Sequence, residues 1–182
     1  MQYTYPHKID NGHGETITFL RLVQEPDGDR LELENEVSPN TGPPMHVHYK
    51  QDEALTVLKG KIGSQVLGED PQFFGPGDTV LFKAGVPHKF WNAGTEPLIC
   101  SGWIKPADNI EYFLTEIYKS TAANKDPRPG AFDSAWLLKR YRSEFDMQEI
   151  PAFVRKVIFP LALFFGKLGG KNKKFADAPA PL

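Results

Sequence analysis

Turn residues recur through the first 106 positions of the chain at short, nearly regular intervals. This part holds 12 of the 16 glycines and 10 of the 16 prolines, in pairs such as Lys59-Gly60 and Ala93-Gly94. Short runs with alternating apolar or β-branched residues separate them, at 16–23, 31–34, 54–58, 62–67, 79–82, 88–92 and 98–104. Many short strands at this spacing predict an all-β sandwich or barrel and exclude a plain helix bundle.

Beyond Pro106 the apolar spacing changes from two to three and four residues, which is typical of helices. We expect helices over 110–118, from about Asp133 to 141, and over 153–168, where Pro160 should kink the third. The pattern predicts a barrel over residues 1–107. It also predicts a helical extension over residues 108–182 that packs on the barrel or on a partner and ends in a mobile basic tail.

The net charge argues against one class of binding partner, and the cysteine count excludes some kinds of site. With 21 basic and 23 acidic residues the formal net charge is -2, which argues against nucleic-acid binding. The single cysteine, Cys100, excludes an intrachain disulfide and a cysteine-based zinc site, so we expect an inert buried thiol. Because no secretory signal or long apolar run is evident, we expect a cytoplasmic protein.

Three histidines and a glutamate stand out as candidate metal ligands. His46 and His48 are two residues apart, so on a strand both side chains project from one face, about 7 Å apart. Glu53 follows five residues later, and His88 begins another predicted strand. Imidazole and carboxylate suit a divalent transition metal and leave open positions for substrate or oxygen, without selecting iron, manganese, nickel, copper or zinc.

Two segments match the motifs of a known family. The stretch from Gly42 to Gly60, which contains H-x-H and Glu53, resembles the first cupin motif. The stretch from Gly77 to Asn92 resembles the second, G-x5-P-x-G-x2-H-x3-N. The resemblance implies a small jelly-roll barrel, the double-stranded β-helix of cupins, with His46, His48, Glu53 and His88 as metal ligands and helices following the barrel.

Each of these residues also has a simpler interpretation. The barrel could keep the motif without holding an ion, and Asp52 is a rival carboxylate that should point away from the site on a strand. His7 and His13 lie in a polar lead segment and are expected to be solvated.

Several apolar and polar residues near the histidines are candidates for a substrate pocket. We name Met45, Phe90 and Asn92, with Phe90 favoured because it shares the strand face of His88 and Asn92. Ordinary barrel core is the alternative for each.

The ligand set supports three hypotheses of function. The first is a metal-dependent oxygenase of a small organic substrate, in which the resemblance suggests that Glu53 also serves as a base. The second is a non-redox isomerase or lyase that uses the same metal site. The third is a module that binds or senses a small ligand without catalysis.

The third predicted helix has its own two interpretations. Residues 151–182 carry six basic residues and one acidic residue, whereas residues 1–150 carry 15 and 22. An apolar helix with a basic end could lie on an anionic membrane surface. We favour packing on the barrel or on a second copy of the chain, and we therefore expect a homodimer.

Overall fold

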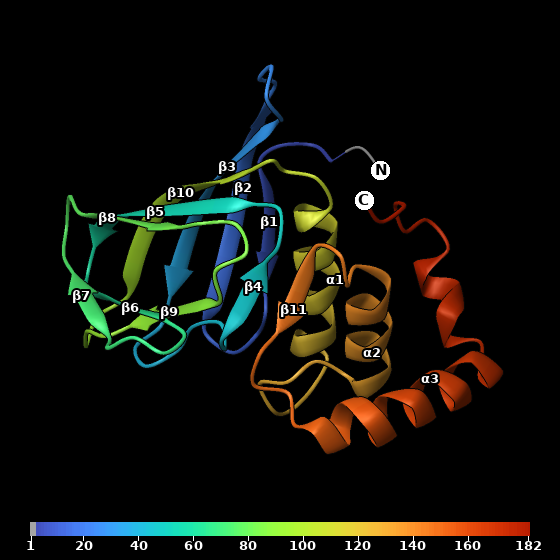
Figure 1. The fold of residues 1–182 in the computed structure, drawn as a ribbon. Helices are drawn as coiled ribbons and strands as arrows, with labels where there is room; N and C mark the ends of the chain where they lie inside the picture. Colours follow the sequence, from blue (N-terminus) through green and yellow to red (C-terminus); the bar gives the residue numbers. More distant parts are fainter. Residues whose placement is uncertain (1–2) are drawn as a thin grey trace.

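The computed structural model describes residues 3–182 and has a β-sandwich at its amino-terminal end and helices at the other (Figure 1). The two antiparallel sheets have the strand orders β1-β2-β3-β10-β5-β8 and β11-β4-β9-β6-β7. The strands are β1 (His7–Asp10), β2 (Glu15–Val23), β3 (Arg30–Val37), β4 (His46–His48), β5 (Asp52–Lys59), β6 (Ile62–Val66), β7 (Gln72–Phe74), β8 (Thr79–Phe82), β9 (His88–Asn92), β10 (Leu98–Lys105) and β11 (Phe145–Met147). The predicted fold class, a β jelly roll followed by C-terminal helices, is confirmed.

Alternation of burial along the strands builds the interior of the sandwich. In β3, Leu31, Leu33, Asn35 and Val37 are 0–3% exposed, whereas the residues between them are partly or fully exposed. The β-strand period of two therefore turns one face of the strand inward. It places a polar residue, Asn35, among apolar ones.

The helix α1 (Ile110–Ala122) fills the side of the sandwich between the two sheet edges, next to β1 and β11 (Figure 1). Its inward face carries Ile110, Phe113 and Tyr118, each at most 6% exposed. The strand β11 comes later in the chain than α1, yet it pairs with β4 of the barrel. A strand from the predicted extension thus completes the second sheet.

The helices α2 (Ala131–Arg140) and α3 (Phe159–Leu168) form the outer part of the extension. A π-helical turn, η1 (Val154–Ile158), leads into α3, and Pro160 lies in the first turn. Residues 152–168 are helical without a break, so Pro160 lies within one helical stretch, directly after the π turn. A proline lacks the N–H group that a helical hydrogen bond requires, and the π turn is the irregularity of the helix at this point.

The last residues pack against α2. The 3-10 helix η2 (Lys171–Phe175) places the ring of Phe175 on that of Trp136, with centroids 4.1 Å apart. Arg140 donates hydrogen bonds to the carbonyl oxygens of Ala178 and Pro179. The segment expected to be a mobile tail therefore makes specific contacts.

Within residues 3–182, none of the helices is both long and apolar enough to cross a membrane.

Candidate metal centre

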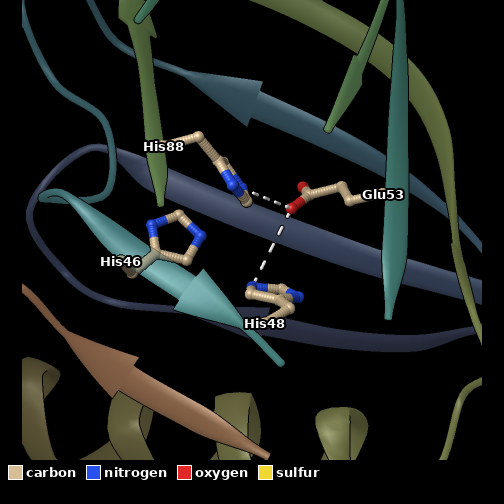
Figure 2. Close-up of side chains that lie close together, drawn as sticks. All are labelled: His46, His48, Glu53 and His88. Atoms are coloured by element: carbon tan, nitrogen blue, oxygen red, sulfur yellow. Dashed lines mark hydrogen bonds and ion pairs between the residues drawn. The ribbon is translucent and has the colours of Figure 1, made fainter. Parts of the chain in front are cut away.

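The backbone register brings the four predicted ligands to one place. His46 on β4 lies directly opposite His88 on β9, and His48 is two residues further along the same face of β4. Glu53 lies near the start of β5 in the other sheet and points across the interior toward them (Figure 2). The cluster thus requires both sheets of the sandwich.

The distances within the cluster are those of groups that can share one ion. One ligand atom from each of the four residues lies within 4.8 Å of all the others. The Glu53 carboxylate oxygen Oε2 is 3.4 Å from His88 Nε2 and 3.9 Å from His48 Nε2. These separations exceed a normal hydrogen bond for His48 and stand at its outer limit for His88, so a central cation fits between the groups better than they fit each other.

Backbone carbonyls orient two of the three imidazoles. His46 Nδ1 lies 2.8 Å from the oxygen of Pro44, and His88 Nδ1 lies 2.8 Å from that of Val86. A carbonyl can only accept, so in each ring Nδ1 carries the proton and Nε2 keeps a lone pair. This carbonyl contact is the usual support of a metal-binding histidine.

The third imidazole retains an unsatisfied nitrogen. The Nδ1 atom of His48 is buried without a hydrogen-bond partner among the described residues. The ring of Phe145 lies edge-on to it, and the stacked ring of Phe82 fixes His88 with centroids 4.0 Å apart. Rigid aromatic neighbours therefore hold two of the histidine rings in place.

Two of the histidines and the glutamate have the protonation states that a metal requires. Desolvation, with the neighbouring imidazoles, lowers the pKa of His46 to about 3, and desolvation lowers the pKa of His48 to about 4. Burial would raise the pKa of Glu53, but the side chain of His88 and the other nearby imidazoles outweigh it and hold that pKa at about 2. At neutral pH the two rings are neutral and Glu53 is anionic, as metal ligands must be.

Comparison with known proteins supports the motif assignment. Residues 34–103 match the family described as Cupin domain. Residues 34–103 form a cupin domain. The match spans the strands β4, β5 and β9 that carry the four residues.

Curated relatives of the cupin chain bear oxidoreductase names. Oxidoreductase iacF of Pestalotiopsis fici is 28% identical over 109 residues, which cover 55% of this chain and 53% of that protein. A second relative, printed as "Probable oxidoreductase virH" of Hypocrea virens, is 34% identical over 68 residues, or 36% of this chain and 31% of the relative. The chain therefore spans about half of one relative and a third of the other.

A solved structure with a similar fold is a sugar phosphate isomerase from a cupin superfamily, from Silicibacter pomeroyi. It is 17% identical, covers 55% of this chain and 71% of its own, and has a TM-score of 0.46.

The histidine cluster opens on a cavity of about 1280 Å³ that extends from the barrel interior to the helical extension, where residues 124–131 and 149–151 line it. His46, His48 and Glu53 line one part of it, and α1 closes another with Phe113, Tyr118 and further residues. The remaining wall is mostly apolar, with contributions from both sheets. Such a space accommodates a small, largely apolar organic molecule beside the candidate ligands.

The three predicted pocket residues have different positions. Phe90 is buried and lines the cavity. Met45 is buried but does not line the cavity. The side-chain Nδ2 of Asn92 donates hydrogen bonds to the backbone carbonyl oxygens of Val37 and Glu96. Asn92 thus braces the loops around β9.

The rival residues also take definite positions. Asp52 points outward and accepts hydrogen bonds from Lys83 Nζ and the Ala84 N–H. Burial raises the pKa of the Cys100 thiol to about 12, as expected for an unreactive cysteine.

The two histidines of the lead segment are engaged and only partly exposed. His7 pairs with Glu111 and stacks on Tyr3, and His13 lines the cavity with Nε2 3.1 Å from the carbonyl oxygen of Asn124. Sequence reasoning had expected both to be solvated.

Three cavity residues escaped the sequence analysis: Glu15, Asn35 and Tyr118. A signal existed for two of them, because Glu15 has the strand parity of Ile17, and Asn35 that of Leu33. A polar residue at an apolar position of a strand therefore indicates a candidate site residue, as a histidine pair does.

Proposed function

We propose that the protein is a metal-dependent oxidoreductase, specifically an oxygenase, that acts on a small organic molecule bound in the barrel cavity. The observation that carries this proposal is the convergence of three imidazoles and one carboxylate, all within 4.8 Å, of which His46, His48 and Glu53 line a mostly apolar cavity. The oxidoreductase names of the two curated relatives are consistent with it.

In this proposal His46, His48, Glu53 and His88 hold the ion. A divalent transition metal bound there supplies a Lewis acid and, when redox-active, a site for reaction with dioxygen. The ligand set carries one negative charge, so the loaded site has a net charge of +1 and favours an anionic oxygen of the substrate.

Other residues of the chain hold the substrate and exclude water. Phe90 from β9 and Phe113 from α1 both line the cavity and offer flat apolar surfaces. The Glu53 carboxylate, anionic and buried, is the group in the cluster that we propose accepts a proton from a bound substrate.

Elemental analysis of the purified protein tests the site. We expect about one equivalent of metal in the wild type and a large loss in His48→Ala and in His88→Ala. His13→Ala is the matched control, since this cavity histidine lies outside the cluster, and it should retain the metal. Equal metal in all four proteins would refute the assignment.

Oxygen uptake then tests the reaction. The metal-loaded protein is supplied with aromatic diols and diketones in air, and consumption of oxygen that His88→Ala abolishes is the expected result. Turnover of a sugar or keto acid without oxygen would instead support the isomerase or lyase. Binding without any turnover would support a sensing module.

A further inference from the structure

A second polar group lies in the cavity away from the histidine cluster. Glu15 at the start of β2, Asn35 on β3 and Tyr118 on α1 all line the cavity and are 5%, 2% and 6% exposed. Such deep burial of a carboxyl and an amide is costly unless both are fully hydrogen-bonded. The three residues come from three separate elements, so their meeting is a property of the tertiary structure.

Asn35 is not fully hydrogen-bonded. Its Nδ2 group reaches the Glu15 carboxylate at 3.4 Å and the Thr16 carbonyl at 3.5 Å, which are long contacts. Its Oδ1 atom is buried and has no partner within residues 3–182. An orphaned acceptor of this kind is costly to bury, and a hydroxyl donor that enters the cavity would satisfy it.

Glu15 complements this acceptor. Burial raises the pKa of its carboxyl to about 7, although the Tyr118 and Asn35 side chains beside it oppose the shift. The carboxyl can therefore donate or accept a hydrogen bond near neutral pH. Together the two residues match a hydroxyl group, which is both donor and acceptor.

The strand register separates this group from the candidate metal ligands. Asn35 pairs with Cys100 of β10, whereas Glu53 pairs with Ile104 of the same strand. Four residues along a strand correspond to about 13 Å between backbone positions, but the side chains approach more closely, because the Glu53 charge also raises the pKa of Glu15. Apolar side chains line the cavity with both groups, including Ile17, Leu33, Leu55, Phe113 and Ile117.

We propose that Glu15 and Asn35 form a distal subsite that binds the hydroxyl group of an elongated, largely apolar hydroxylated substrate. The subsite itself requires only the cavity and the orphaned amide oxygen. The further statement, that the opposite end of the same molecule reaches His46, His48, Glu53 and His88, rests on the proposed function. The pair then selects for substrate length and for a hydroxyl at the far end.

A pair of probes that differ only in a donor tests the subsite. 2-Naphthol has a hydroxyl group, and in 2-methoxynaphthalene a methyl ether replaces it. Fluorescence titration of the full-length protein, with and without a metal chelator, gives the ratio of the two dissociation constants. We expect the wild type to bind the naphthol about tenfold more tightly, the value of one well-placed hydrogen bond.

Two near-isosteric substitutions locate the effect. Asn35→Leu removes the free acceptor and should bring the ratio close to one. Thr121→Val is the matched control: it also removes a polar atom from the cavity wall, but that hydroxyl already donates to the Ile117 carbonyl, so the ratio should stay near ten. If the leucine variant does not fold, Asn35→Ala should give the same loss.

The outcomes separate the subsite from the metal site. A wild-type ratio near one, or equal losses in Asn35→Leu and Thr121→Val, overturns the subsite whatever the metal content. A ratio near ten that persists with chelator supports the subsite even if elemental analysis finds no metal. A ratio that disappears with chelator places the hydroxyl at the metal and overturns the subsite as well.

Discussion

The barrel interior and the surface of α3 depart from the usual rule of burial in opposite directions. Inside the barrel, His46, His48, Glu53, Glu15 and Asn35 line one cavity, and His88 completes the ligand cluster beside it. From Phe153 through η1 and α3, large apolar side chains face outward: Phe153, Val157, Ile158, Leu161, Phe164, Phe165 and Leu168 are 36–72% exposed. Buried polar groups and exposed apolar patches are the informative exceptions in a folded protein.

The two exceptions differ in how the chain creates them. The interior groups come from β2, β3, β4, β5 and β9, and only the closure of two sheets brings them together. The apolar residues of α3 are adjacent in sequence and would be clustered in any helix. The first exception therefore requires the tertiary fold, whereas the second needs only local structure.

The largest expected effect concerns the interior carboxylate. Glu53→Gln keeps the shape of the side chain but removes its charge. Loss of a contact that only supports a ligand lowers metal affinity about 10–100-fold, and loss of a direct ligand should lower it further. We expect metal affinity to fall by at least about a hundredfold, measured by competition with a chromogenic chelator. The outward-facing Asp52→Asn serves as the control, and an equal loss in both variants would contradict the choice of Glu53.

The next effect concerns an apolar residue that the extension does bury. Phe175 is 4% exposed and stacks on Trp136, so Phe175→Ala should lower the free energy of unfolding by about 4 kcal/mol. Phe153→Ala, at 64% exposure, should change it by about 0.5 kcal/mol or less. Urea denaturation measures both. Similar small changes would show that the end of the chain does not contribute to stability.

A somewhat smaller effect should appear as a pH dependence. The pKa of Glu15 in the folded protein is about 7, above its ordinary 4.5, so the folded state binds more protons than the unfolded state between these values. Its contribution to stability is complete below pH 4.5 and is lost as pH rises through 7. Relative to Glu15→Gln, the wild type should lose up to about 3 kcal/mol between pH 4.5 and 8.

Urea denaturation at these two pH values measures that difference, and Glu34→Gln on the outer face of β3 is the control. A constant difference between wild type and Glu15→Gln across the range would show that Glu15 ionises normally.

The smallest effect on stability should come from α3. The double substitution Phe164→Ser and Phe165→Ser affects exposed side chains and should shift the free energy of unfolding by no more than about 0.5 kcal/mol per site. We expect this face to form the predicted homodimer, so sedimentation should show the double variant as a monomer. Leu58→Ser, on an exposed position of β5, should leave the assembly unchanged. Loss of the dimer in Leu58→Ser alone would place the interface on the barrel.

The candidate metal ligands were the easiest part to predict. His46 and His48 share a strand face by parity alone, and the spacing from Gly77 to His88 resembled a known motif. The same parity favoured Phe90 as a pocket residue, and Phe90 lines the cavity. Parity did not predict the roles of Met45 and Asn92. An inward-facing side chain can line a cavity, pack in the core as Met45 does, or hold a loop in place as Asn92 does.

The cavity itself was beyond sequence reasoning. The helix α1 forms part of its wall. The second sheet of the barrel is completed by β11, a three-residue strand whose length and composition do not indicate a strand. The meeting of Asn35 with Glu15 and Tyr118 depends on how α1 packs between the sheet edges. The orphaned oxygen of Asn35 is visible only after every neighbouring donor has been placed.

Local periodicity and motif spacing thus determined most of the strands, the helices, the barrel class and the four candidate ligands, because each depends on patterns within short segments of the chain. The tertiary structure alone decided the size of the cavity and the second polar subsite. These depend on contacts between segments as far apart as β2 and α1, and no local pattern encodes the fit between such surfaces.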